Sequence, residues 1–441
     1  MSARLLLITV VVASLGAAAC EKTDHESIDK WTRTQKGPGK LKKALGDEGL
    51  DADLSAHAGA NMIRMGNDPE VREVMEAMSP TRRVQVIEKL APRLWDVARI
   101  EREDALPGPP QVTAKDALIG LRKYGSDAEK QQIDTYLIDW YATVSYEGRA
   151  KVGAVLGAAV MRMVGPPGGK KLMSIANATI AAPGQDKQKN RIGDELMIGL
   201  AASGNPEAVK YVLDIAHMDR GDTTLPKRAL NALHTAYVNP SGLFDLADAA
   251  ALVPNLDALV AVAKDESMPG QAVNDAIELI RATGAPACLP PLMAMIPYPH
   301  KEPRFRYAIA YAAVKCGGTK SFVDVAKALP DSATYAKDDL NGSVSGEIAK
   351  LTPRAQVLEG LRQLLGDKHR MSRWVAIEAL TLMKSVEDAP KIAQLSGAKD
   401  RLVGFWGDQS DKDPKDRKED PTLGQRAKDL ADALGSGQAP K

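Results

Sequence analysis

The sequence has 441 residues, of which 44% are hydrophobic and only 4% aromatic, so its core would consist mainly of small and aliphatic side chains. Lys and Arg number 58 and Asp and Glu 57, a near balance that argues against a general nucleic-acid binder, which would carry a strong basic excess. A chain of this length makes two or three compact domains or one long repeat array.

The first 20 residues have the organisation of a targeting segment. Arg4 supplies a positive charge, and the apolar run from Leu5 to Val12 is too short to span a membrane comfortably. Small residues then precede Cys20, and this pattern resembles the bacterial lipobox, although Ala17 stands where leucine is usual. The resemblance implies that Cys20 is acylated and becomes the mature N-terminus. Ordinary signal-peptidase cleavage after Ala19 is the alternative.

If Cys20 carries a lipid, the protein is attached to a membrane of the bacterial cell envelope. More than one acyl chain on this cysteine would make the attachment stable, whereas a single chain is marginal. We expect an outer-membrane location, with the protein facing the periplasm or the cell surface.

One pattern recurs after residue 50: a small residue, an aliphatic stretch, a turn eight residues after the small residue, and a second amphipathic helix. A glycine at the turn suits a helix C-cap because glycine adopts positive φ without strain. The pairs of first residue and turn glycine are Ala58–Gly66, Ala117–Gly125, Gly157–Gly165, Leu196–Gly204, Ala276–Gly284 and Ala310–Gly318. Weaker copies without the glycine begin at Ala229 and Ala376.

Successive copies between Ala117 and Ala310 lie 33 to 47 residues apart, close to the repeat length of HEAT and armadillo units. No strand pattern of comparable strength occurs, so we predict a mature chain that is nearly all helix. Residues 50–400 resemble the bacterial short-HEAT family, whose repeats also occur in phycobilisome lyases and many envelope proteins. The resemblance implies an all-α fold, an α-solenoid of HEAT-type helical hairpins, and indicates little about function.

Composition divides the chain further. We expect residues 21–40 to form a tether with a first helix, and residues 41–101 to form an N-terminal helical cap or first HEAT unit. A proline-rich stretch up to residue 112 would separate this cap from the main solenoid, residues 113–400. Residues 401–421 are dense in charge and predicted to be a flexible linker, and residues 422–441 a C-terminal helix and tail.

The usual catalytic motifs are absent: the sequence has no GxSxG, HExxH, P-loop or GxGxxG pattern. HEAT-type hydroxylases use repeated His-Glu pairs for iron, but the only such pair here is His25-Glu26, outside the repeats. The other histidines fall singly in different units. We therefore predict that the protein is not an enzyme and has no metal site and no cofactor. These histidines are His57, His217, His234, His300 and His369.

Besides Cys20 the chain has two cysteines, Cys288 and Cys316, without a CxxC pair that would indicate a zinc site. In an oxidising envelope the two could form a disulfide between neighbouring repeats. The interpretation we favour from sequence alone is that both are buried small hydrophobic residues.

A basic stretch in the middle of the array is the most specific candidate for a binding surface. Eight basic residues stand against a single acid, Asp186, which gives a local net charge of +7 in an otherwise balanced chain. If stacked hairpins bring these charges to one face, the face would attract an acidic partner. A solvated helix surface is the alternative. The residues are Arg149, Lys151, Arg162, Lys170, Lys171, Lys187, Lys189 and Arg191.

Aromatic side chains suggest two further surfaces. Phe405 and Trp406, between two glycines, could anchor a partner because exposed Trp is enriched at binding hot spots; capping of the last hydrophobic layer is the alternative. A second cluster would be either core, which we favour, or the wall of a groove. This cluster is Tyr136, Trp140, Tyr141 and Tyr146.

We therefore predict a membrane-anchored envelope scaffold whose HEAT-repeat surface binds a protein or an anionic envelope polymer, and not nucleic acid. The alternative is a lyase-like or chaperone-like HEAT-repeat protein that binds a small ligand in an aromatic-lined groove.

Overall fold

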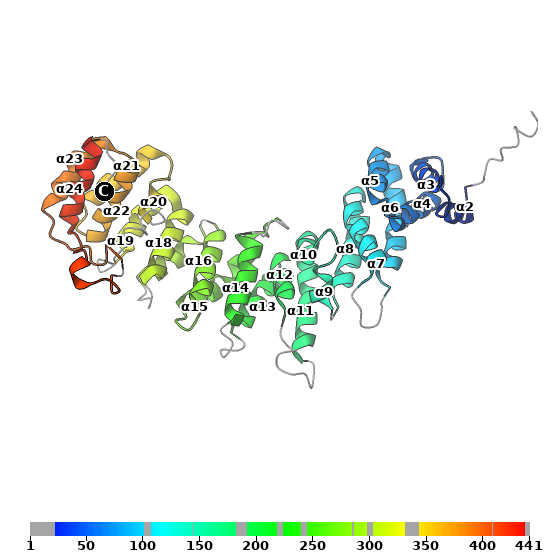
Figure 1. Cartoon of the computed structure of the whole chain (residues 1–441), viewed down its shortest axis with the longest axis horizontal. Coiled ribbons are helices and arrows are strands. Elements are labelled where there is room, and N and C mark those ends of the chain that lie inside the picture. Colours follow the sequence, from blue (N-terminus) through cyan, green and yellow to red (C-terminus); the bar gives the residue numbers. More distant parts are fainter. Residues whose placement is uncertain are drawn as a thin grey trace, which may run out of the picture. The chain divides into compact units, whose positions relative to one another are not determined.

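The computed structural model describes residues 23–100, 107–143, 145–181, 192–217, 224–239, 245–284, 286–297, 303–330, 344–407 and 409–436 (Figure 1). These residues form 23 α-helices, and extended pairing among them is limited to one isolated bridge between Arg401 and Thr422. The predicted all-α class is therefore confirmed. Within the same residues, no helix combines the length and the apolar character that crossing a membrane requires.

The chain packs into two compact units. The N-terminal unit comprises Met1–Val164 and Asn177–Asn190, and the C-terminal unit comprises Gly165–Ala176 and Arg191–Lys441. The proline-rich stretch before residue 113 does not separate them. Helix α6 (Pro80–Ala98) precedes it and α7 (Pro109–Leu121) follows it, and these two helices pack against each other within the N-terminal unit.

In the N-terminal unit, alternate helices pack side by side. Helix α2 (His25–Trp31) contacts α4 (Ala52–Arg64), α4 contacts α6, and α6 contacts α8 (Asp127–Tyr141). The intervening helices form a second row, in which α3 contacts α5 and α5 contacts α7. The core between the rows is aliphatic, as composition predicts. The remaining helices are α3 (Gly37–Gly46), α5 (Asp68–Ala77), α9 (Tyr146–Arg149) and α10 (Gly157–Val164).

The C-terminal unit repeats this arrangement. Contacts run in series from α12 through α14, α16, α18, α20 and α22 to α24, which Figure 1 shows in green to red. A second row includes α13, α15 and α17, and α19 contacts α21. The helices are α11 (Pro166–Ala181), α12 (Asp194–Ala202), α13 (Pro206–Ile215), α14 (Thr224–Tyr237), α15 (Leu256–Lys264), α16 (Gly270–Ala282), α17 (Leu289–Met295), α18 (Pro303–Gly317), α19 (Phe322–Ala328), α20 (Val344–Ile348), α21 (Arg354–Leu365), α22 (Arg370–Leu382), α23 (Ala389–Ala393) and α24 (Leu423–Ser436).

The predicted glycine turns are largely present. Five of the six turn glycines have positive φ, between 58° and 82°, which residues with a Cβ rarely adopt. Gly125 is the exception, because a 3₁₀ turn (Arg122–Tyr124) ends the preceding helix and leaves this glycine extended at φ −78°. The first residue of every copy is buried, as close helix packing requires. The five glycines are Gly66, Gly165, Gly204, Gly284 and Gly318.

The segment predicted as a tether with a first helix, residues 21–40, is helical over most of its described length. Asp24 caps α2, because its carboxylate accepts a hydrogen bond of 2.9 Å from the amide of Ser27. Ile28 and Trp31 of this short helix are buried. Local capping and apolar burial therefore fold a segment whose polar composition indicated a tether.

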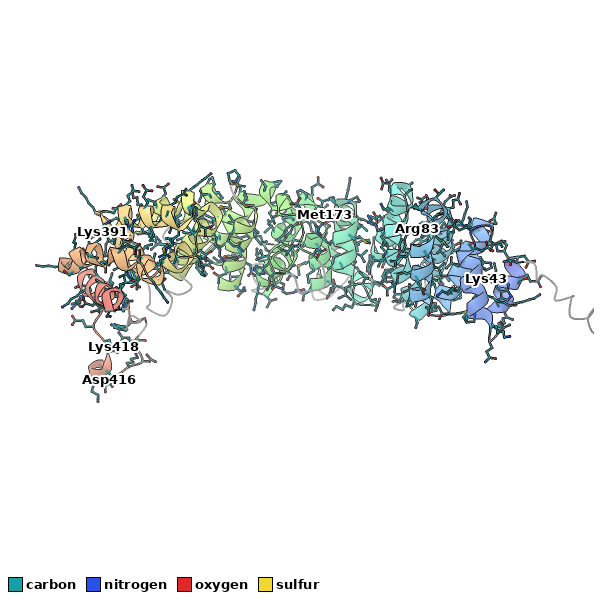
Figure 2. The ribbon with its side chains drawn as sticks, turned by 90° about the horizontal axis from the view of Figure 1, so that it is seen from above. Lys43, Arg83, Met173, Lys391, Asp416 and Lys418 are labelled. Atoms are coloured by element: carbon teal, nitrogen blue, oxygen red, sulfur yellow. A yellow bond between two sulfur atoms is a disulfide. The ribbon has the colours of Figure 1, made fainter. Side chains whose placement is uncertain are left out.

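The residues described between 401 and 421, for which a flexible linker is predicted, form a closed loop. The amide of Leu402 donates to the carbonyl of Pro421 at 2.9 Å. Gln409 and Lys418 exchange two hydrogen bonds, of 3.0 and 2.9 Å. In Figure 2 the labelled Lys418 lies on this loop, below the C-terminal helices. Composition indicated disorder, but backbone groups at the two ends of the segment pair with each other.

Candidate functional site in the N-terminal unit

A cavity of about 330 Å³ lies among α4, α6 and the start of α7. Its volume is in the range of small-molecule or side-chain pockets. Most of its wall is aliphatic, and two arginines, Arg64 and Arg93, together with Thr113, supply polar groups. The lining residues are Ala60, Ile63, Arg64, Met65, Gly66, Arg93, Leu94, Val97, Pro109, Pro110, Thr113 and Ala114.

The two arginines differ in their partners. Arg93 donates to a carboxylate oxygen of Asp53 at 2.8 Å and is one-third exposed. Arg64 is exposed, and no acid in the described part of the chain lies within ion-pairing distance of it. Because guanidinium groups bind carboxylates in a planar, two-pronged geometry, Arg64 is the group of this cavity that is available to an anion.

Next to the cavity, four side chains form a continuous polar chain. Two come from α2 and two from α4: His25, Asp29, Asp53 and His57. Nδ1 of His25 lies 2.9 Å from Nδ1 of His57. Nε2 of His57 lies 2.9 Å from a carboxylate oxygen of Asp29, and Nε2 of His25 lies 3.3 Å from one of Asp53. Asp53 also accepts from Arg93, so this chain joins the wall of the cavity.

The environment shifts the pKa of three members of the chain. Burial lowers the pKa of His57, and the nearby Asp29 opposes this only in part. Burial alone would raise the pKa of Asp29, but hydrogen bonds from Asn61 and His57 and the charges of His57 and Arg64 outweigh it, so the net pKa is lowered. The hydrogen bond from Arg93 lowers the pKa of Asp53. Both carboxylates are therefore held in their charged, acceptor form.

Sequence reasoning missed this chain. His25 and His57 are 32 positions apart, and the sequence relates His25 only to Glu26 and leaves His57 single. The contact follows from the packing of α2 on α4, a tertiary relationship that no local sequence pattern encodes. Within the described residues, no group of three or more His, Cys, Asp or Glu side chains is arranged to hold a metal ion.

The aromatic cluster does not line a groove. Trp140, Tyr141 and Tyr146 are 1%, 0% and 2% exposed, so they belong to the core, as favoured from the sequence. Tyr136 is partly exposed and stacks on Trp95 with 5.0 Å between ring centroids. The alternative function, a small ligand bound in an aromatic-lined groove, has no support in this cluster.

A fully buried lysine, Lys115, lies next to these rings. The Lys115 ammonium is 2.5 Å from Asp116 and within hydrogen-bonding distance of the carbonyls of Val152 and Val155. Burial lowers the pKa of Lys115, although the hydrogen bond to Asp116 opposes this. Since all of these partners are protein groups, Lys115 fastens the loop before α10 to α7.

The basic stretch is only partly described. Lys187, Lys189 and Arg191 lie outside the described residues. Arg149 is half-buried, and its guanidinium donates to the carbonyl of Trp140, so it is part of the core boundary. The others divide between the units: Lys151 and Arg162 belong to the N-terminal unit, and Lys170 and Lys171, both exposed, to the C-terminal unit.

Phe405 does not serve as an exposed anchor. It is 2% exposed and packs with Trp374 of α22, so it closes the last hydrophobic layer. Trp406 is partly exposed, and its ring nitrogen donates to the carbonyl of Glu419 at 3.0 Å. The ammonium of Lys418 lies 4.5 Å from its ring centroid. Intramolecular contacts therefore already hold both rings.

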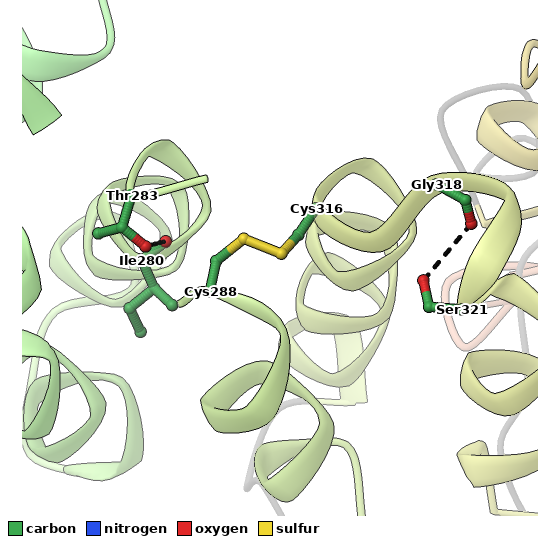
Figure 3. Close-up of a disulfide and its surroundings, with 6 residues drawn as sticks. All are labelled: Ile280, Thr283, Cys288, Cys316, Gly318 and Ser321. Atoms are coloured by element: carbon green, nitrogen blue, oxygen red, sulfur yellow. Dashed lines mark hydrogen bonds between the residues drawn. A yellow bond between two sulfur atoms is a disulfide. The ribbon is translucent and has the colours of Figure 1, made fainter. Parts of the chain in front are cut away.

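Cys288 and Cys316 form a disulfide, with their Cα atoms 6.2 Å apart (Figure 3). The bond joins the start of α17 to the end of α18, which are neighbours in the helix series. The favoured interpretation, two separate buried thiols, is wrong. Cys288 is fully buried, as that interpretation expects. The disulfide forms because the two helix ends bring the sulfur atoms together, which the sequence does not show. Cys20 lies outside the described residues.

Comparisons with known proteins add little. No protein-family model matches the chain, and no curated protein matches it. Among solved structures, an engineered protein from the Northeast Structural Genomics Consortium is 14% identical over 95% of this chain and 97% of that chain, with a TM-score of 0.28. A superposition this loose carries no argument about fold or function.

Proposed function

We propose that the protein is a lipid-anchored scaffold of the bacterial envelope, built as an α-solenoid of HEAT-type hairpins, that binds a protein partner in the cavity among α4, α6 and α7. The series of contacts between alternate helices and the positive φ of five turn glycines support the solenoid. The disulfide supports an oxidising compartment, since such bonds are rare in the cytosol.

The anchor is tested on its own. Cys20→Ala should move the protein from the detergent phase to the aqueous phase, because acylation of Cys20 is what would hold it at the membrane. Unchanged partition in this variant would overturn the anchor. The outer-membrane assignment is checked by separating inner and outer membranes of cells that make the unaltered protein.

The cavity carries the binding part of the proposal. An aliphatic wall with an exposed arginine, Arg64, at its edge fits an aliphatic side chain next to a carboxylate, as at a peptide C-terminus ending in leucine. Arg64 would hold the carboxylate, while the apolar residues of α6 and α7 would cover the side chain. This proposal assigns no catalytic step and no cofactor.

Short peptides ending in leucine test it directly. The peptide with a free C-terminus should bind more tightly than its amidated form, and Arg64→Gln should abolish the difference, as measured by fluorescence anisotropy. Lys36→Gln is the matched control, because Lys36 is exposed in the same unit and away from the cavity. Equal binding of the free and amidated peptides by the unaltered protein would overturn the carboxylate assignment.

The basic stretch supports a second candidate, an anionic polymer, because Lys170 and Lys171 are exposed on α11. Replacing Arg162, Lys170, Lys171 and Lys187 with Glu should reduce recovery of such a partner and flatten the salt dependence of its binding. If recovery and salt dependence match the wild type, the stretch is only a solvated surface.

A further inference from the structure

The number of protons on the two histidines decides whether the polar chain Asp29–His57–His25–Asp53 can form all of its contacts. Its three contacts are a carboxylate with Nε2 of His57, Nδ1 of His57 with Nδ1 of His25, and Nε2 of His25 with a second carboxylate. An ionised carboxylate only accepts hydrogen bonds, so each Nε2 must carry a proton. Two neutral imidazoles have no further proton, and their Nδ1 lone pairs would face each other at 2.9 Å.

A single additional proton satisfies every contact. It makes one Nδ1 a donor and leaves the other as an acceptor, at a distance usual for a hydrogen bond between two nitrogens. A fourth proton is unfavourable in turn, because two N–H groups and two positive charges would then meet between the rings. The pair therefore has one protonation state in which the whole chain is satisfied.

We infer that His25 and His57 share one proton and form a pH-sensitive latch that holds α2 on α4. The latch is closed when the pair carries one extra proton, and it opens in acid, when the second ring is also protonated. Loss of the shared proton in alkali weakens it as well. This inference concerns only the N-terminal unit and does not depend on the proposed lipid or partner.

The charged groups around the pair favour a single positive charge. Asp29 and Asp53 offset the imidazolium, while Arg93 opposes a second one, and burial of His57, whose side chain is 13% exposed, adds to this. The charged groups that face the chain are Asp29 on α2, Asp53 and Arg64 on α4, and Arg93 and Lys89 on α6.

Opening the latch leaves most of the unit intact. Helix α2 has seven residues, of which only Ile28 and Trp31 are buried. Its packing against α4 therefore depends on few side chains, and the histidine pair is a large part of it. The core of α4 and α6 lies beneath it and does not involve the histidines. Acid should therefore raise local opening of α2 without unfolding the rest.

Hydrogen exchange of the full chain, with rates corrected for the intrinsic effect of pH, measures this opening. Over a pH series, protection of the α2 amides should pass through a maximum and fall about tenfold toward acid and toward alkali, the scale expected for one lost charged hydrogen bond. His25→Gln, at a half-exposed side chain, should remove this pH dependence. Helix α24, which has no histidine, is the internal reference.

Three outcomes would overturn the inference. Protection of α2 that shows no maximum over the pH series in the unaltered protein excludes a latch. Persistence of the pH dependence in His25→Gln assigns it to another group. If EDTA removes the protection at pH 7 and Zn²⁺ restores it, the ion between the rings is a metal ion and not a proton.

Discussion

Glu378 of α22 and Arg426 of α24, 48 positions apart in the sequence, form an ion pair from which water is almost excluded. Nε of Arg426 lies 2.8 Å from one carboxylate oxygen and Nη2 lies 3.2 Å from the other, and the side chains are 8% and 7% exposed. Trp374 also donates to Glu378, at 3.3 Å. The pair therefore fastens the C-terminal helix to the helix series, across the closed loop that precedes it.

Arg426→Met should destabilise the C-terminal unit by about 3–5 kcal/mol, because it leaves the Glu378 carboxylate buried without a counter-charge. The free energy of unfolding in urea, followed by circular dichroism, checks this. Arg401→Met is the matched control: Arg401 pairs with Glu419 at the surface, so its loss should cost less than about 1 kcal/mol. Equal losses in the two variants would contradict the distinction.

Cys288→Ala combined with Cys316→Ala should lower the free energy of unfolding by about 2–4 kcal/mol, since the bond closes a loop between residues 28 positions apart. The melting temperature of the unaltered protein should fall when reductant is added, while that of the double variant should not respond. Thiol titration of the unreduced protein provides a second check, because neither cysteine should react. Two reactive thiols in the native protein would show that the bond is absent.

Gly204→Ala should cost roughly 1–2 kcal/mol, because the residue has φ of 66° and an alanine there would be held in the left-handed region. No atom within 4 Å would clash with the added methyl group, so backbone strain alone is tested. Gly397→Ala is the control: its surroundings are equally open, but its φ is not in that region. A melting temperature unchanged in Gly204→Ala would mean that the turn differs from the one described.

The helical class and the turns were predictable because their signals are local. The Gly eight residues after a small residue marks a helix end, and in the structure Gly204 and Gly284 do adopt positive φ. The exception, Gly125, follows a 3₁₀ turn, a change of hydrogen bonding that composition does not reveal. At residues 401–421, where charge density predicts a flexible linker, the two ends of the segment pair with each other, a relationship that composition does not reveal.

The candidate site was not predictable, because its parts come from different helices. The contact between His25 and His57 needs α2 folded onto α4, and the cavity needs α6 and α7 packed against α4. No short motif encodes either relationship. The aromatic cluster shows the same limit: helical spacing placed its members together, but only packing shows that three of the four are core.

Ala310→Leu tests the close approach of helices that the repeat pattern predicts. Ala310 is fully buried in α18, which packs between α16 and α20 in the C-terminal unit. A leucine adds three carbon atoms where neighbouring helices leave no room, so the variant should lose roughly 1–3 kcal/mol of unfolding free energy. Ala261→Leu on α15 is the control, because Ala261 is exposed within a helix and leucine is nearly as good a helix former as alanine. Urea unfolding of both variants gives the comparison. If Ala310→Leu is as stable as Ala261→Leu, α18 is not in close contact with α16 and α20 at this position, and the assignment of Ala310 as the small residue of its repeat is wrong.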